Sequence, residues 1–353
     1  MSCLDLRDLT RNELEIWVKD LGLPRFRASQ IFKWLWTPGI VSFDQMTNLS
    51  KALRSEIGEK ACIGSLRKLD VQTSKDGTVK FAWLLKDGQI IESVLIPERS
   101  HFTLCLSTQV GCAMGCAFCH TAKMGFKRNL TPGEIAGQAL AALEHSSAGS
   151  DLKNLVFMGM GEPLANYDNL IKALQILTDD HGLNFSWRRI TVSTCGLVPQ
   201  MLRLGKDVDV GLAISLHAPD NDLRSRIMPI NQKFSLDELI EGCRQYPLSK
   251  RRRITFEYIL LGGLNDSVDH AKKLAKLLRG IRSKINLIPY NHSPDLPFKS
   301  PEWSDVEAFR NELMRHNYTA IVRKSKGTDI KAACGQLYAE HSKRVQTACA
   351  SIS

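Results

Sequence analysis

Beyond residue 100 the sequence alternates short apolar runs with helical stretches, and this alternation limits the possible folds more than any other feature. Strands separated by helices form right-handed βαβ units, whose strands pair in a parallel sheet that is either open or curved toward a barrel. We therefore predict an α/β fold for this part of the chain. The apolar runs are FTLCLS, NLVFMG, RRITVST, VGLAISLH, RITFEYILL, KINLIPY and YTAIVR.

Residues 1 to about 65 have the pattern of a small helical module. Thr10 followed by Glu13 is the signature of a capping box, which marks the start of a helix, and GLP at 22–24 is a stop signal. A second amphipathic segment, RFRASQIFKWLW, follows this break.

Residues 66–98 predict a β-meander, with turns at the two KDG sequences. In the last strand, QIIESVLI, the two-residue periodicity places Glu92 on the same face as its apolar neighbours. The pattern fits a partly solvated face as well as it fits a functional carboxylate.

The composition suggests a soluble, cytoplasmic protein with reduced thiols. Ten cysteines in 353 residues are too sparse for a disulfide scaffold, and the beginning MSCLDLRDLTRNE lacks the apolar run of a signal peptide. We expect no membrane span, because no segment is apolar for long enough. The formal net charge of +10 can attract a polyanion, although basic proteins without nucleic-acid partners share this property.

Three cysteines at tight spacing form the most informative motif. Residues 112–119 read CAMGCAFC, so that Cys112, Cys116 and Cys119 have the spacing C-x3-C-x2-C. A structural zinc site normally has four ligands in two close pairs, but no second pair is near, and His120 directly adjoins Cys119. Three thiolates around an iron–sulfur cluster leave one iron open, and an open iron can bind a substrate.

Together with this spacing, several other motifs resemble those of a known enzyme family. C-x3-C-x2-C is the signature of radical S-adenosylmethionine (SAM) enzymes. Further motifs narrow the resemblance to the RlmN family of adenine C2 RNA methyltransferases, and the similarity extends from the N-terminal helices to about Leu337. These motifs are MGMGEP, STCG, SLHAP, DIKAACGQL, GFKRNL, RIMPIN and KINLIPYN.

The resemblance implies an α/β fold with a partial (β/α)6 radical SAM barrel at residues 99–340. A helical accessory domain that binds RNA (1–65) and the β-meander (66–98) would precede the barrel, and a C-terminal tail (341–353) would follow it. Polar or glycine-rich residues follow most of the predicted strands, and the carboxyl ends of such strands form the site in these folds.

The resemblance also implies two cofactors and the residues that hold them. Cys112, Cys116 and Cys119 would ligate a four-iron four-sulfur (4Fe-4S) cluster, and SAM would bind its open iron, with two molecules used per turnover. Glycine allows close backbone approach, a carboxylate pairs with the ammonium group of SAM, and polar tips at strand ends reach ribose hydroxyls. The implied SAM-binding residues are Gly161, Glu162, Ser193, Ser215, Leu216, His217 and Asn291.

Carbon 2 of adenine is electron-poor and does not attack the methyl group of SAM directly, so radical chemistry is needed. In the mechanism that the resemblance implies, Cys334 first takes a methyl group from one SAM. A 5′-deoxyadenosyl radical from a second SAM activates this methyl, which then adds to carbon 2. Cys105 attacks the sulfur of Cys334 to release the methylated base as a disulfide forms, and Glu92 accepts the proton of carbon 2.

The implied partners are 23S ribosomal RNA (rRNA), transfer RNA (tRNA) beside the anticodon, and a reduced flavodoxin or similar electron donor to a monomeric enzyme. One alternative is the sister class of enzymes, which methylates carbon 8 of the same ribosomal adenine and confers antibiotic resistance. A second alternative is a non-catalytic RNA-binding protein with iron–sulfur or zinc. We expect RNA contacts from basic clusters near the site, namely Lys123, Lys127 and Arg128, Trp187 to Arg189, and Lys250 to Arg253.

Overall fold

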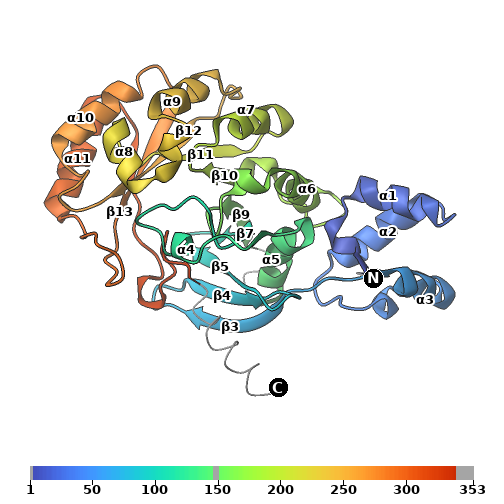
Figure 1. The fold of residues 1–353 in the computed structure, drawn as a ribbon. Helices are drawn as coiled ribbons and strands as arrows, with labels where there is room; N and C mark the ends of the chain where they lie inside the picture. The colour runs from blue at the N-terminus through green and yellow to red at the C-terminus, as the bar shows by residue number, and fades with distance from the viewer. Residues whose placement is uncertain (1–2, 146–150, 339–353) are drawn as a thin grey trace.

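A ten-stranded sheet organises the chain in the computed structural model, which describes residues 3–145 and 151–338 (Figure 1). The strand order is β14-β13-β12-β11-β10-β9-β6-β5-β4-β3. Strands β6 and β9 to β14 are parallel, whereas β3 to β6 form an antiparallel meander. Strand β6 therefore belongs to both parts, because it pairs antiparallel with β5 and parallel with β9.

The predicted meander is confirmed, and both KDG sequences form its turns. Gly77 and Gly88 have φ angles of 83° and 79°, which only glycine adopts without strain. The turn aspartates add hydrogen bonds, because Asp76 accepts from the backbone N–H of Thr78 and Asp87 from that of Gln89. The four strands are β3 (Arg67–Thr73), β4 (Val79–Leu84), β5 (Ile90–Pro97) and β6 (Phe102–Cys105).

All seven apolar runs beyond residue 100 form strands of this sheet. Parallel strands are covered on both faces, which explains why the runs are continuously apolar rather than alternating; all seven residues of β12 are buried. After β6, the parallel strands are β9 (Leu152–Phe157), β10 (Ile190–Thr194), β11 (Gly211–Ser215), β12 (Ile254–Leu260), β13 (Ser283–Pro289) and β14 (Ala320–Val322).

Helices connect the parallel strands along the outer side of the sheet (Figure 1). Each strand from β6 to β13 is followed by at least one helix, so that the sheet and helices form the predicted partial barrel of six units, with β14 as a seventh strand. The helices are α4 (His120–Lys123), α5 (Pro132–His145), α6 (Tyr167–Thr178), α7 (Val198–Asp207), α8 (Asn221–Ile227), α9 (Leu236–Gln245), α10 (Val268–Leu277) and α11 (Trp303–Arg315).

The N-terminal helical module stands to one side of the barrel (Figure 1). The predicted capping box is confirmed at the start of α1, where Thr10 and Glu13 exchange hydrogen bonds. Inside the module, the buried guanidinium of Arg7 donates to three backbone carbonyls. The module contains β1 (Leu4–Asp5), α1 (Arg11–Asp20), α2 (Phe26–Leu35), α3 (Lys51–Lys60) and β2 (Ala61–Cys62).

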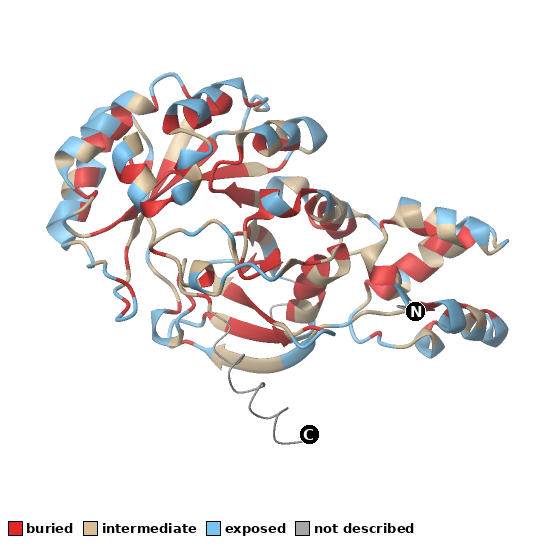
Figure 2. Cartoon of the chain, viewed as in Figure 1, coloured by how far each residue is buried: buried red, intermediate tan, exposed pale blue. Residues whose placement is uncertain are grey.

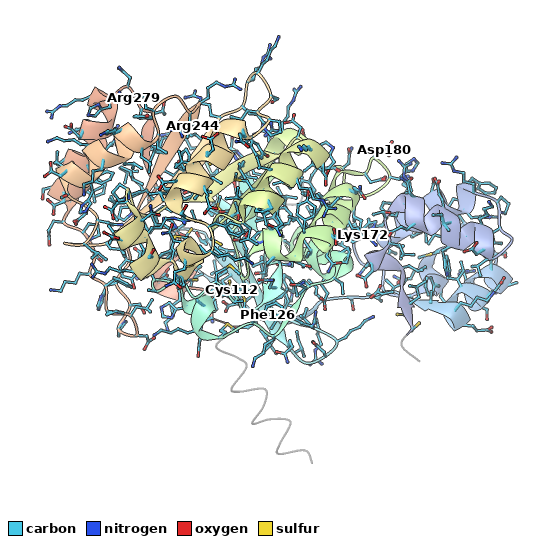
Figure 3. All side chains as sticks on the ribbon, turned by 45° about the horizontal axis from the view of Figure 1, so that its top comes forward. Cys112, Phe126, Lys172, Asp180, Arg244 and Arg279 are labelled. Carbon is cyan, nitrogen blue, oxygen red and sulfur yellow. The ribbon has the colours of Figure 1, made fainter. Side chains whose placement is uncertain are left out.

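Ion pairs join this module to the barrel. Lys172 of α6 contacts Glu13 at 2.5 Å, and Arg11 contacts Asp179 at 2.9 Å and Asp180 at 3.1 Å. Figure 3 shows Lys172 and Asp180 on the side of the barrel that faces the module.

The hydrophobic core lies between the sheet and its helices, where buried residues concentrate on the strands and on the inner faces of the helices (Figure 2). Within residues 3–145 and 151–338, none of the helices combines the length and apolar character of a transmembrane span. The predicted tail at 341–353 lies outside the described residues.

Candidate active site

A cavity at the carboxyl ends of the parallel strands brings together most of the predicted site residues. The cysteine loop follows β6, the GEP sequence follows β9, and the STCG and SLHAP sequences include the last residues of β10 and β11. Predicted residues that line this cavity are Cys105, Cys112, Cys116, Cys119, Gly161, Glu162, Ser193, Ser215, His217 and Cys334.

The three-cysteine loop lies between β7 (Gln109–Val110) and α4, and backbone hydrogen bonds fix it. Cys112 N–H donates to Gly125 O at 3.2 Å, and Cys119 N–H donates to Cys116 O at 3.1 Å. Ala117 N–H donates to Ile227 O at 2.9 Å, which attaches the loop to the end of α8. Figure 3 places Cys112 well inside the outline of the barrel, away from Arg244 of α9 and from Arg279, which follows α10.

The electrostatics of these thiols suit a cationic group. Burial raises the pKa of Cys112 to about 12, and burial also raises the pKa of Cys116 and Cys119. The charges of Cys119 and Cys112 raise the pKa of Cys116 further. In the part of the chain that the structure describes, no three His, Cys, Asp or Glu side chains are placed to hold one metal ion. The donor set fits a cluster, in which each thiolate binds a different iron.

Cys334 and Cys105 line the same cavity from different elements. Cys105 is buried at the end of β6, and burial raises its pKa to about 12, with a further contribution from the nearby charge of Cys334. Cys334 is solvent-accessible although protein surrounds it, because its accessible surface faces the cavity. Burial raises the pKa of Cys334, and the guanidinium of Arg323 opposes this effect.

The segment from Gly327 to Tyr338 carries Cys334 between the cysteine loop and the meander. On one side it contacts residues that directly follow Cys119, and on the other side it contacts the turn between β3 and β4. These hydrogen bonds are His120 N to Gly335 O (2.7 Å), Thr121 Oγ1 to Leu337 O (2.7 Å), Ser74 Oγ to Asp329 Oδ1 (2.6 Å) and Gly327 N to Asp76 Oδ2 (3.1 Å).

Glu162 and Gly161 occupy a constrained turn after β9. The Glu162 carboxylate accepts from the backbone N–H groups of Cys195 (2.8 Å) and Leu164 (3.1 Å), and burial raises its pKa. Gly161 has a φ of 97°, and a Cβ there would lie 2.5 Å from the Cβ of Gln109. The turn therefore requires glycine beside the carboxylate that is predicted to bind the SAM ammonium group.

His217 has a defined proton arrangement. Its Nδ1 accepts from the backbone N–H of Ile259 at 3.0 Å, and its ring meets Phe118 edge-on at 4.9 Å between centroids. Burial lowers the pKa of His217 to about 3, so that the ring is neutral and Nε2 carries the hydrogen. The residue can donate one hydrogen bond without adding charge.

Two predicted SAM-binding residues do not line the cavity. The side chain of Leu216 is buried in the core, while its backbone N–H donates to Glu257 O at 3.0 Å. The Asn291 amide donates to Ser325 Oγ at 2.8 Å. In this arrangement both residues stabilise the strand ends behind the cavity.

Glu92 is buried, so the interpretation of its face as partly solvated is wrong. Its residue exposure is 1%, and the C-terminal segment contacts its carboxylate. Its Oε2 accepts from the backbone N–H of Tyr338 at 3.0 Å, and its Oε1 lies 3.7 Å from Lys80 Nζ. Glu92 does not itself line the cavity, but Val94 and Ile96 of the same face do.

Sequence reasoning missed three charged residues at the site. Arg323 follows β14 and faces Cys334 and Glu257, whose charges raise its pKa against the effect of burial. Glu257 lies on β12, is buried, and accepts from the Asn286 amide at 2.8 Å. The third is Arg224 of α8, which is fully buried. A charged residue inside or next to an apolar run is the only sequence signal that could have indicated Glu257 or Arg323.

The predicted basic clusters differ in position. Trp187–Arg189 and residues 250–253 precede β10 and β12, so they lie at the amino ends of the strands, and our expectation that they lie near the site is wrong. Lys123 and Lys127 are exposed beside the cysteine loop. Arg128 forms ion pairs with Asp87 and Glu134, which makes it a structural link between the meander and α5.

Comparison with known proteins agrees with this geometry. Residues 4–63 match the family described as the ribosomal RNA large subunit methyltransferase N-terminal domain, and residues 106–278 match the radical SAM superfamily. A crystal structure of a radical SAM methyltransferase from Sphaerobacter thermophilus superposes with a TM-score of 0.91 at 46% identity, covering 96% of this chain and 100% of that chain.

Two relatives are similar over nearly their full lengths, and both are described as dual-specificity RNA methyltransferase RlmN. The protein from Syntrophus aciditrophicus is 51% identical over 337 residues, which cover 96% of this chain and 97% of the relative. The protein from Desulfosudis oleivorans is 53% identical, over 95% of this chain and 91% of the relative. With its three-cysteine loop, its partial barrel and this level of identity, the chain belongs to the RlmN family of radical SAM methyltransferases.

Proposed function

We propose that this protein methylates carbon 2 of an adenine in 23S rRNA and of an adenine beside the anticodon in tRNA. The observation that carries the proposal is the meeting of Cys105, Cys334 and the three-cysteine loop in one cavity. A simple methyl-transfer enzyme would not need two further thiols beside its cofactor site. The dual-specificity RNA methyltransferases to which the chain is similar support both RNA substrates.

In this proposal, Cys112, Cys116 and Cys119 hold the 4Fe-4S cluster, and the residues around Glu162 hold SAM. When bound, the cluster and two SAM molecules per turnover supply the electron, the methyl group and the hydrogen abstraction that the reaction needs. The buried carboxylate of Glu162 accepts two backbone N–H bonds and retains lone pairs for an ammonium group. Neutral His217, with Ser193 and Ser215, supplies uncharged polar groups around the nucleoside part.

The protein's own residues have separate roles in the reaction. Cys334 carries the methyl group, because it is an exposed residue that lines the cavity, whereas Cys105 is buried. Arg323 favours the thiolate of Cys334 for this step, since the two charges attract. After the methyl carbon has bonded to the base, the unpaired electron of the adduct would return to the cluster, and Glu92 takes the proton from carbon 2. Cys105 attacks the sulfur of Cys334, and the sulfur–carbon bond breaks as the disulfide forms. The electron pair of that bond stays with the former methyl carbon, which takes up a proton to complete the methyl group.

Several finer statements belong to the same proposal. We infer that a reduced flavodoxin or similar protein supplies electrons, that the enzyme acts in the cytoplasm, and that it is a monomer. Lys123 and Lys127 are the basic residues best placed to contact RNA, because both are exposed and follow the cysteine loop within a few residues.

The proposal is tested by anaerobic reconstitution with iron, sulfide and dithionite, followed by incubation with SAM and unmodified rRNA or tRNA fragments. Nucleoside mass spectrometry should find 2-methyladenosine, and 5′-deoxyadenosine should form in parallel. C8-methyladenosine as the main product would assign the protein to the sister activity. RNA binding without 5′-deoxyadenosine, from protein with a full cluster, would indicate a non-catalytic role. Cys243→Ala is a matched control, because Cys243 is a buried cysteine of α9 that does not line the cavity.

A further inference from the structure

A buried ion pair lies beside the cavity, and the reaction as proposed uses only one of its members. Lys80 Nζ of β4 lies 3.7 Å from Glu92 Oε1 of β5, and the side chains are only 7% and 2% exposed. Taking two charges out of water is costly, and removing one partner of such a pair leaves an uncompensated charge in the interior. A sheet strand at this position could carry two apolar residues instead, so the pair requires an explanation.

The strand register places Lys80 in a row that leads to the reacting thiols. Lys80 lies opposite Val94, and Val94 lies opposite Cys105, so the three side chains share one face across β4, β5 and β6. Val94 and Cys105 line the cavity, and Glu92 lies two residues from Val94 on the same face. The ion pair therefore adjoins the place where Cys105 and Cys334 meet.

The other oxygen of Glu92 is also engaged. Its Oε2 accepts from the backbone N–H of Tyr338, four residues beyond Cys334. The titratable and charged groups that β4, β6 and the C-terminal segment bring toward this carboxylate are Lys80, Cys105 and Tyr338. Of these, Lys80 is the cation.

We propose that Lys80 is a positioning residue that keeps the buried Glu92 ionised and oriented, so that its carboxylate can take the proton of carbon 2 when the RNA adduct is resolved. This inference rests on the proposed function. The proton leaves carbon 2 and goes to a carboxylate oxygen of Glu92, while Lys80 does not touch the base. A carboxyl group that is buried without a cation takes up a proton from solvent instead, and it can then no longer accept one from carbon 2.

The test compares Lys80→Met with the wild-type enzyme in a single turnover, at several values between about pH 7 and about pH 9. Three quantities are measured: the cluster content, the methylation of Cys334, and the rate at which the covalent protein–RNA adduct disappears from denaturing gels. Lys80→Met should load the cluster and methylate Cys334 normally, but accumulate the adduct at about pH 7. The deficit in resolution rate should shrink as the pH rises, by up to about tenfold per pH unit, as the unpaired carboxyl ionises.

The ratio of the resolution rates of wild type and Lys80→Met isolates the effect of the Glu92 carboxyl group. The thiol of Cys105, whose pKa is raised to about 12, contributes the same pH dependence to both proteins. Lys80→Arg should restore wild-type resolution, because it keeps the cation. In Glu92→Gln the adduct should persist at every pH. Lys68→Met, at an exposed lysine of β3 in the same meander, is the matched control and should behave as wild type.

A rate for Lys80→Met equal to wild type at every pH, or a deficit that does not change with pH, would overturn the proposal. If Lys80→Met fails to load the cluster, Lys80→Gln replaces it as a variant that retains a polar tip without the charge. Failure of the proposed function is a separate result, since wild-type enzyme would then make no 2-methyladenosine and Cys105→Ala would trap no adduct.

Discussion

Replacing Arg224 with methionine should destabilise the protein and loosen the SAM-binding side of the cavity. Arg224 is fully buried in α8. Its guanidinium donates to Cys195 O at 2.6 Å, to Asn231 Oδ1 at 2.9 Å and to Leu216 O at 3.2 Å, with a longer bond to Ser215 O at 3.4 Å. It thus ties the loop after β10 to the loop after β11, and strand β10 and the loop after β11 carry the predicted SAM-binding residues Ser193, Leu216 and His217.

The expected magnitude follows from these contacts. Hydrogen bonds from a charged donor contribute about 1.5–3 kcal/mol each, so the loss of the three shorter bonds amounts to about 5–9 kcal/mol. Burial lowers the pKa of Arg224 from 12.5 to about 10, which means that folding disfavours its charged form. At neutral pH, which is below both pKa values, the cost of burying the charged guanidinium is fully present. Removing the charge therefore adds back about 3 kcal/mol to the free energy of unfolding. We therefore expect a net loss of about 2–6 kcal/mol.

Anaerobic urea denaturation, followed by circular dichroism on protein without its cluster, measures this loss in free energy of unfolding. Arg226→Met is the control, because Arg226 is an exposed residue of the same helix, and its effect should stay within about 0.5 kcal/mol. SAM affinity, measured on protein with its cluster, should fall only in Arg224→Met. A stability change below about 1 kcal/mol for Arg224→Met would refute the reasoning, because the loss of these hydrogen bonds from a charged donor could not then carry the expected cost.

Three further predictions concern the reaction. Cys334→Ala should keep its cluster and cleave SAM but yield no methylated RNA, and peptide mass spectrometry of wild type should find the methyl on Cys334; an active variant would exclude this route. Cys105→Ala should trap a covalent RNA complex that survives denaturant and disappears with nuclease, and normal multiple turnover would reduce Cys105 to a packing residue. Gly161→Ala should weaken SAM binding, because its Cβ would lie 2.5 Å from Gln109 Cβ and its φ of 97° is strained; unchanged affinity in equilibrium dialysis would contradict this.

Local sequence patterns predicted the fold, because each pattern is caused by interactions between neighbouring residues. The apolar runs predicted the strands, the KDG sequences predicted the turns, and the capping box at Thr10 predicted the start of α1, since all these signals act within a few residues. The sheet edge that carries the site followed from the topology of parallel strands. Residue burial was harder to predict, as Glu92 shows: its face is covered by a segment almost 250 positions later in the chain.

The site was predicted unevenly for the same reason. Cysteine spacing identified the loop, but nothing near Arg224 in the sequence indicates that its acceptors lie on two loops and a neighbouring turn. Lys80 and Arg323 likewise acquire their importance from partners on other elements. Two basic clusters were wrongly predicted to lie near the site, because a charge count does not reveal at which end of a strand the charges lie.

The hydrogen bonds that hold the Cys334 segment join residues that are far apart along the chain. Thr121 and Leu337 are 216 positions apart, and Ser74 and Asp329 are 255 apart. Contacts that close such long loops form slowly compared with turns, hairpins and helices. We therefore expect Cys334 to enter the cavity late, after the meander and the barrel have folded. On a ribosome, the cysteine loop and most walls of the cavity are made before Cys334 is synthesised, so we expect the cavity to be completed only after residue 334 has emerged.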